Sequence, residues 1–188
     1  VFICGSICGG TGAGTFLDMA YFVRNVASLI SKSSIYIYGM LGLASLFEGI
    51  QGDANIKPNC YASLVELDHF MNPFTYQNEY RRFFPAYKNI GPKQWDYSKS
   101  AENGPFDFPF LFDKTNSAGF SLSSGAAFSE MVARFIYLLT GHEVAQEWQS
   151  MDNNIRKNLD TTYLYQKFQK PNNYRSMGTF SVMFPRRM

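Results

Sequence analysis

The first fifteen residues, Val1–Thr15, read VFICGSICGGTGAGT, and they decide how the rest of the chain is interpreted. Val1–Cys4 is apolar and rich in β-prone residues, which predicts a buried strand. Glycine then dominates up to Thr15, where we expect an amphipathic helix to begin. A strand, a glycine loop and a helix N-terminus in this order are typical of a phosphate site, because backbone N–H groups and the helix dipole face one concavity.

Two common phosphate-binding motifs do not fit this glycine run. A P-loop ends in Gly-Lys-Ser/Thr, whereas Gly14 is followed directly by Thr15. A dinucleotide fingerprint needs its third glycine at the position that Thr15 occupies. The run that remains is Gly9–Gly14, GGTGAG, and its alternative interpretation is a purely structural turn before a helix.

This run resembles the tubulin signature G-G-G-T-G-[ST]-G, with Cys8 at the first position and Ala13 at the Ser/Thr position. In tubulins and in the bacterial cell-division tubulins, this loop wraps the phosphates of GTP. The resemblance implies a bacterial tubulin-like protein whose ligand is GTP, with or without Mg²⁺. The phosphate-binding residues that it implies are Gly9, Gly10, Thr11, Gly12, Ala13 and Gly14.

The residues after the glycine run predict a βαβ unit. Apolar residues at helical spacing predict a helix over Thr15–Ile30, in which Thr15 and Asp18 would form a capping box. Ile35–Leu43 is apolar on both faces, as expected of a central parallel strand. A second helix is predicted over Pro58–Met71, because proline is favoured in a first helical turn.

The second half of the chain predicts one more strand and one more helix of the same body. Phe106–Phe112 should be a strand, and Pro109 favours an edge position or a bulge there. A third helix is predicted over Ser129–Thr140, with a start near Ser123 as the alternative. Together these elements predict an α/β fold, a three-layer sandwich with a Rossmann-like, mostly parallel sheet.

The resemblance also implies how the chain is divided. Residues 1–140 would be the C-terminal portion of a tubulin nucleotide-binding domain, ending with the central helix of the family. Residues 141–188 would be connecting helices and the first strand of the following domain, for which Met177–Pro185 has the alternating pattern. Since Val1 begins inside a strand, we expect a longer protein, with half of the nucleotide pocket upstream.

Three further site residues follow from the resemblance. Glu48 stands in a Phe-Glu-Gly sequence like the one whose glutamate contacts the ribose, although Gly52 replaces the family's arginine. Asn116 is the best match for the asparagine that faces the guanine base. The alternatives are a solvated loop carboxylate and an ordinary turn asparagine. Asp152 lies in a stretch similar to the tubulin loop that reaches the nucleotide of the next subunit, which makes it the candidate catalytic acid.

Composition limits the partners. The 188 residues are 46% hydrophobic, which is enough for a core, and the net charge of +2 gives no basis for a nucleic acid or an anionic membrane as partner. No apolar stretch approaches the roughly 18–20 residues of a membrane span. Three cysteines without metal-ligand spacing predict reduced thiols, no metal site and a cytoplasmic protein.

Three functions stay open at this point. The first is a GTP-binding domain that hydrolyses GTP and self-assembles into filaments. The second is a non-catalytic tubulin-like scaffold, which the departures from the family's signature allow. The third is an NAD(P)-dependent short-chain dehydrogenase, because Tyr163 and Lys167 form a Y-x-x-x-K pair with Ser150 upstream. Thr11 stands where such an enzyme has the last glycine of its loop, which disfavours this third function.

Overall fold

The computed structural model describes residues 1–30, 35–49, 53–71, 104–116, 119–122 and 125–141, together with the short stretches 146–148, 150, 153–154 and 174–176. Some of the expectations above fall on other residues and lie outside this description. They include the strand Met177–Pro185, the candidate acid Asp152, and the pair Tyr163 and Lys167.

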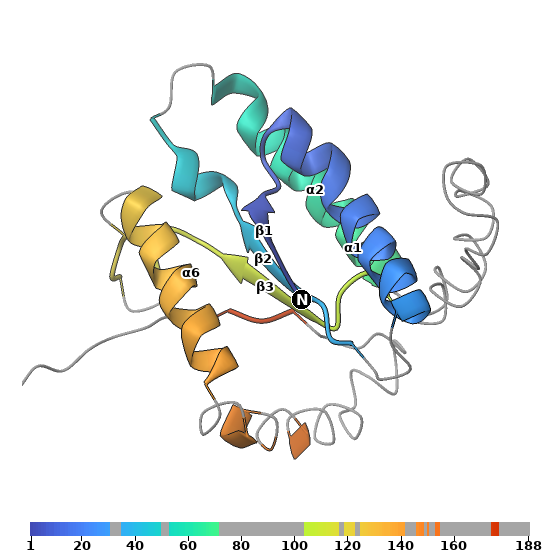
Figure 1. The fold of residues 1–188 in the computed structure, drawn as a ribbon. Helices are drawn as coiled ribbons and strands as arrows, with labels where there is room; N and C mark the ends of the chain where they lie inside the picture. The colour runs from blue at the N-terminus through green and yellow to red at the C-terminus, as the bar shows by residue number, and fades with distance from the viewer. Residues whose placement is uncertain are drawn as a thin grey trace, which may run out of the picture.

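Three parallel strands form the sheet, in the order β1, β2, β3 (Figure 1). They are β1 (Phe2–Ser6), β2 (Tyr38–Gly42) and β3 (Phe108–Phe112). Parallel neighbours need a crossover connection, and α1 (Gly10–Ile30) provides the one from β1 to β2. The predicted parallel pairing of the first two strands is confirmed.

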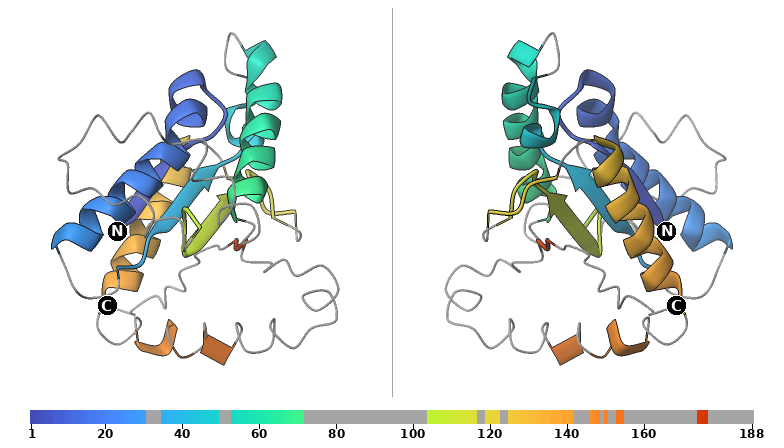
Figure 2. Two further views of the ribbon diagram at one scale, coloured as in Figure 1. Left: turned by 90° about the vertical axis from the view of Figure 1, so that its right-hand side faces the viewer. Right: turned by 90° about the vertical axis from the view of Figure 1, so that its left-hand side faces the viewer.

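Helices cover both faces of this sheet, so the predicted three-layer α/β sandwich is confirmed. α1 and α2 (Ile56–Met71) lie side by side on one face, and α6 (Gly125–Thr140) covers the other (Figures 1 and 2). Two short 3-10 helices, η1 (Ala44–Phe47) and η2 (Asp53–Asn55), lie between β2 and α2.

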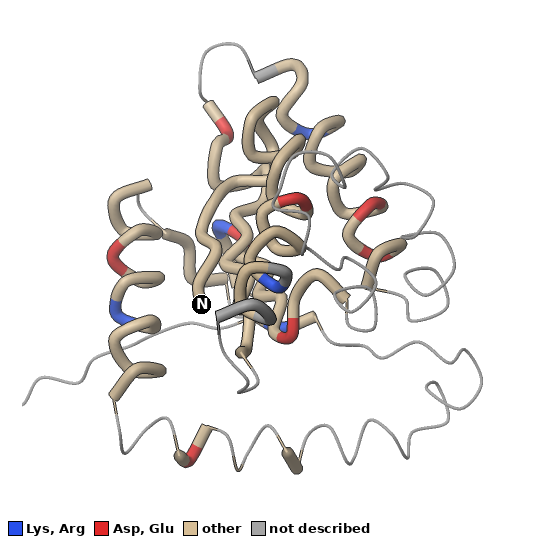
Figure 3. The backbone as a smooth tube through the Cα atoms, turned by 45° about the vertical axis from the view of Figure 1, so that its right-hand side comes forward, with Lys and Arg blue, Asp and Glu red and all other residues tan. Residues whose placement is uncertain are grey.

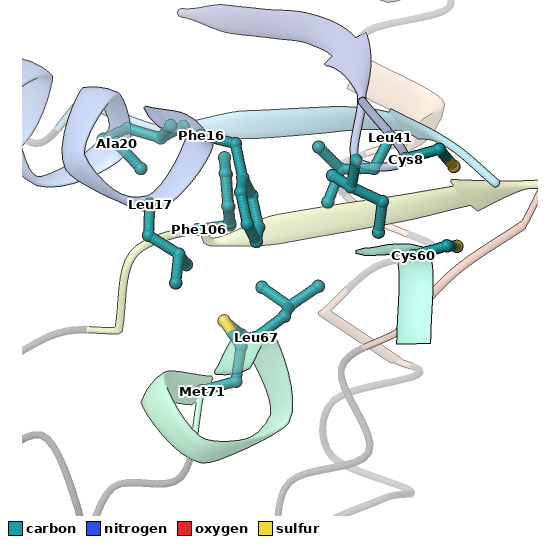
Figure 4. Packing of buried hydrophobic residues seen from close by; sticks show 11 residues of the cluster. Cys8, Phe16, Leu17, Ala20, Leu41, Cys60, Leu67, Met71 and Phe106 are labelled. Atoms are coloured by element: carbon teal, nitrogen blue, oxygen red, sulfur yellow. The ribbon is translucent and has the colours of Figure 1, made fainter. Parts of the chain in front are cut away.

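Each face of the sheet has its own apolar cluster, because successive strand residues point to opposite faces. Leu41 faces α1 and α2, whereas its neighbour Met40 faces α6. The first cluster includes Ile7, Phe16, Ala20, Leu67 and Phe106 (Figure 4). The second consists mainly of phenylalanines, Phe108, Phe110, Phe112 and Phe135. Aromatic side chains therefore fill much of the layer beneath α6.

The helices begin earlier than the sequence predicts. α1 begins at Gly10 and not at Thr15, and α2 begins at Ile56 and not at Pro58. The predicted capping box is wrong, because Thr15 lies in the second turn of α1 and donates its hydroxyl to the Thr11 carbonyl at 2.8 Å. Glycine is a poor helix former, so local propensity places the start too late, and packing of the first turn on β1 overrides it.

Pro109 lies in the middle of β3 without a bulge, and its edge position is confirmed for the described sheet. Arg175 forms a parallel bridge on the outer side of β3: its N–H donates to the Pro109 carbonyl at 2.9 Å, and its carbonyl accepts the Leu111 N–H at 2.8 Å. The N–H and C=O of one strand residue point the same way, so the missing N–H of Pro109 faces away from β2 and costs no bond within the sheet.

The side chains of this added segment anchor it on both faces of the sheet. The Arg175 guanidinium lies 4.8 Å from the centre of the Phe108 ring and 5.9 Å from that of Trp148. The Tyr174 hydroxyl donates to Asp68 Oδ1 of α2 at 3.3 Å. Burial beside this carboxylate raises the pKa of Tyr174, so the hydroxyl keeps its proton at neutral pH.

A largely buried ion pair ties the elements together at the amino ends of the strands. Arg24 Nη2 of α1 lies 3.0 Å from Asp107 Oδ2, with the two side chains 10% and 21% exposed. The same carboxylate oxygen accepts the Ile37 N–H at 2.7 Å, and Arg24 Nε donates to the Gly104 carbonyl at 2.6 Å. The pair therefore joins α1, the chain before β2 and the chain before β3.

We predict that Asp107→Ala lowers the free energy of unfolding by about 2–4 kcal/mol, because it leaves a mostly buried guanidinium and the Ile37 N–H without their acceptor. Glu130→Ala is the matched control, since it removes an exposed pair on α6 worth less than about 0.5 kcal/mol. Urea unfolding of the two variants measures the difference. Equal losses would mean that the Arg24–Asp107 pair does not hold the fold.

Candidate functional site

The parallel strands all end at the same edge of the sheet, and the loops that follow them meet there. These loops are residues 7–9 after β1, residues 43–49 after β2 and residues 113–116 after β3. Ligands of open α/β sheets bind in the crevice at this carboxyl edge. The structure thus brings the glycine run, Glu48 and Asn116 to one edge of the sheet.

The loop after β1 is held by its own hydrogen bonds. The Cys8 N–H donates to Ser6 Oγ at 3.1 Å, which closes a tight turn. The Ile7 N–H donates to the Gly42 carbonyl at the end of β2 at 3.3 Å. These bonds fix the direction in which the chain enters α1.

The N-terminus of α1 offers a group of main-chain donors. The first hydrogen bond of the helix runs from the Ala13 N–H to the Gly9 carbonyl at 2.9 Å. The N–H groups before it, those of Gly10, Thr11 and Gly12, come before the helical ladder and face outward from the helix end. Three adjacent donors and the positive end of a long helix attract an anion.

The glycines of the run serve two different physical needs. A Cβ on Gly12 would lie 1.9 Å from the Ser6 carbonyl oxygen, so α1 packs on the end of β1 at a distance that only glycine allows. A Cβ on Gly9, Gly10 or Gly14 would meet no atom within 4 Å. Gly12 is therefore required by packing, whereas Gly10 leaves room in front of the donors.

A cavity of about 630 Å³ lies between this edge of the sheet and α6. It is lined by Cys4, Gly5, Ser6 and Met40 of the sheet, by Leu46 and Phe47 of η1, and by Gly125, Phe128, Ser129, Val132, Ala133 and Ile136 of α6. The lining is mostly apolar and the volume suits a small-molecule ligand. Ser6 belongs both to this cavity and to the turn that leads into the glycine run.

Sequence reasoning misses the α6 side of this cavity. Phe128 follows the apolar helical spacing, and such a residue is normally assigned to the core. Ser129 is predicted only as the first residue of that helix. The order of elements could have identified Phe128 and Ser129. The chain leaves β3 at the carboxyl edge of the sheet, so the helix that follows β3 begins beside that edge.

Glu48 is an exposed carboxylate at the end of η1. Its Oε1 lies 3.5 Å from Lys57 Nζ in the first turn of α2, and both side chains are at least half exposed. Such a pair contributes less than about 1 kcal/mol, so a ligand hydroxyl can compete with Lys57 for the carboxylate.

Asn116 holds the loop after β3. Its side-chain Oδ1 accepts the Phe120 N–H at 2.9 Å, and its main-chain N–H donates to the Phe120 carbonyl at 3.0 Å. The structure therefore gives Asn116 a role in the shape of the loop, and its contact with a guanine base stays a prediction.

Asp113, which the sequence analysis did not single out, joins two of the edge loops. Its Oδ1 accepts the hydroxyl of Ser45 in η1 and the N–H of Lys114. The Lys114 N–H also lies 3.0 Å from Ser45 Oγ, and the Leu43 N–H donates to the Phe112 carbonyl at 2.9 Å. The loops after β2 and β3 therefore behave as one unit.

Charged side chains do not define the site. In the described part of the chain, acidic and basic residues are scattered along the backbone (Figure 3), and no three His, Cys, Asp or Glu side chains gather around one point. An anion at this edge would be held chiefly by main-chain dipoles. The described helices include none that is long and apolar enough to cross a bilayer.

The model of a family described as tubulin like matches the chain over residues 1–188, which is its whole length. No curated protein and no solved structure gives a significant match.

We predict opposite effects on stability for two alanine substitutions in α1. Gly12→Ala should destabilise the protein by about 1–3 kcal/mol, because its Cβ pushes the helix off the Ser6 carbonyl. Gly14→Ala should stabilise it by up to about 1 kcal/mol, since alanine is the better helix former and nothing lies within 4 Å. Thermal unfolding measures both. Unchanged stability of Gly12→Ala would contradict the close packing. For the same reason, a loss of nucleotide binding in Gly12→Val could reflect a disturbed fold.

Proposed function

The chain belongs to the tubulin-like family, and on that premise we propose that it binds a guanine nucleotide at the carboxyl edge of its sheet. One observation carries the proposal. Three adjacent N–H groups, from Gly10 to Gly12, precede the hydrogen-bond ladder of a 21-residue helix that directly follows a parallel strand. In this proposal they donate to the phosphates, which would satisfy groups that otherwise have only water as partner.

The neighbouring cavity supports a position for the nucleoside. A purine is flat and apolar on both faces, and the cavity offers apolar walls, among them Phe128 of α6. In this proposal Glu48 contacts the ribose and Asn116 the base edge. An asparagine amide has both a donor and an acceptor, with which it can pair with the edge of a base.

The proposal extends to hydrolysis of GTP between two subunits of a self-assembled filament. Main-chain donors stabilise the charge that develops on the phosphates, but they do not position an attacking water. Asp152 is the proposed acid that a neighbouring subunit would supply. Since the described residues form no cluster of three acidic side chains, Mg²⁺ would be coordinated chiefly by phosphate oxygens and water.

A non-catalytic scaffold is the second candidate, and one observation favours it. Glu48 pairs with Lys57, and Asn116 accepts the Phe120 N–H. These contacts within the chain can explain both side chains without a nucleotide. Membership of the tubulin-like family gives no support to the dehydrogenase alternative.

We predict that Gly10→Val weakens GTP binding by the full-length protein about tenfold or more. The side chain would occupy the space in front of the donors, and losing even one hydrogen bond to a charged group has an effect of this size. Because a Cβ at Gly10 meets no atom within 4 Å, the fold should persist. Calorimetric titration with GTP measures the affinity. Met19→Val, at an exposed position of α1 beyond the glycine run, is the control. Unchanged affinity of a folded Gly10→Val variant would rule out the phosphate site.

We predict that GTP turnover per subunit rises with protein concentration, because the acid comes from a second subunit. Asp152→Ala should reduce turnover by roughly 10²-fold or more, which is typical of losing a positioned general base, while the affinity for GTP stays the same. Phosphate release at several protein concentrations measures this. Asp160→Ala, the next acid along the chain, is the matched control. Turnover per subunit that is independent of concentration would contradict the mechanism.

A further inference from the structure

Two buried cysteines meet behind the glycine run. Cys8 directly precedes Gly9, and Cys60 lies in the second turn of α2. Their side chains are 2% and 4% exposed and belong to the same apolar cluster. Figure 4 shows the two sulfur atoms one above the other, pointing in the same direction from their two elements. Besides burial, the neighbouring Cys60 thiol raises the pKa of Cys8, as expected of two side chains that lie close together.

Cys8 connects the loop to the surrounding structure. Its Sγ donates to the Gly42 carbonyl at the end of β2 at 3.5 Å, and it shares an apolar cluster with Cys60 of α2. Cys4, the third cysteine, is exposed and lines the cavity on the α6 side of the sheet, so it does not belong to this pair. The position of Cys8 is one at which the chain departs from the glycine of the tubulin signature.

We propose that Cys8 and Cys60 are a redox-active pair, and that their disulfide controls the glycine run. The co-reactant is a peroxide. One thiol of the pair is oxidised by hydrogen peroxide to a sulfenic acid, and one water is released. The other thiol attacks that sulfur, the S–O bond breaks, the S–S bond forms, and a second water leaves. Two thiols are thus oxidised and one peroxide is reduced to two waters.

The disulfide would move the chain that carries the anion donors. An S–S bond is about 2.05 Å long, far shorter than a contact between two thiols, so Cys8 is drawn toward α2. The proton that Cys8 donates to the Gly42 carbonyl is lost as well. Gly9, the next residue, supplies the carbonyl for the first hydrogen bond of α1, so the donors of Gly10–Gly12 shift with it. The oxidised form should therefore bind GTP more weakly, an expectation that rests on the proposed function.

Burial also determines how slowly the pair reacts. It raises the pKa of Cys8 to about 11, so the thiol stays protonated at neutral pH and the reduced pair is stable. Oxidation therefore has to be followed over hours. A fast reaction would be expected only of an exposed thiol such as Cys4.

The first experiment identifies the bond. The folded full-length protein is incubated with hydrogen peroxide, denatured in N-ethylmaleimide, digested and mapped by mass spectrometry. The expected product is a linked pair of peptides containing Cys8 and Cys60, which dithiothreitol separates. Cys4→Ser should form the same link, whereas Cys60→Ala should form none. A link to Cys4, or no link in the folded protein, would overturn the proposal.

The second experiment measures the effect on the site in the protein that keeps its native Cys4, so that the cavity lining is unchanged. Oxidised protein should bind GTP roughly tenfold more weakly or worse than reduced protein, and dithiothreitol should restore binding. The Cys60→Ala variant should be insensitive to peroxide. An oxidised form with unchanged affinity would overturn the control of the loop. If the reduced protein binds no GTP, the proposed function fails, but the redox inference can still be tested by amide hydrogen exchange of residues 9–15. A change in their exchange rates on oxidation supports the inference. Unchanged rates overturn it.

Discussion

The contact between the Ser6 carbonyl oxygen and Gly12 determines the rest of the structure. It allows the first turn of α1 to pack directly on the end of β1, at a separation that excludes any side chain. With the helix end in this position, the Gly10–Gly12 donors lie at the carboxyl edge of the sheet. The same packing lets Phe16 and Ala20 reach the apolar cluster under the sheet. The geometry of the site and the burial of the core therefore both depend on the close packing of the Gly12 main chain on that of Ser6.

The site is then a consequence of strand direction. Three parallel strands bring their loops to one edge, and hydrogen bonds between the loops make that edge a single unit. Ile7 binds Gly42 across the first two loops, and Asp113 with Ser45 joins the second and third. The redox pair proposed above lies against the same unit, because Cys8 Sγ donates to the Gly42 carbonyl at the end of β2 and Cys60 lies on α2.

The fold and the site could be predicted to different depths, for physical reasons. Apolar runs and their period were enough to predict the three strands and the crossover helix, whereas Glu48 and Asn116 were named only from the resemblance to tubulins. The start of α1 was predicted too late, because glycine propensity is local whereas the packing of Gly12 on Ser6 is tertiary. The partners of Asn116 and Glu48 depend on how loops close, which no periodicity encodes. Phe128 could not be distinguished from a core residue by sequence, because the cavity that it lines is formed only when α6 packs against the sheet.

The bridge between Arg175 and β3 has a consequence for how this protein behaves among its neighbours. An outer strand with unsatisfied main-chain groups is a template on which other molecules can add their own strands. Here the outward carbonyl of Pro109 and the outward N–H of Leu111 are already bonded to Arg175, and the proline ring removes the remaining donor. The stacking of the Arg175 guanidinium on Phe108 and Trp148 holds that cover in place. This side of the sheet is thereby protected against edge-to-edge aggregation.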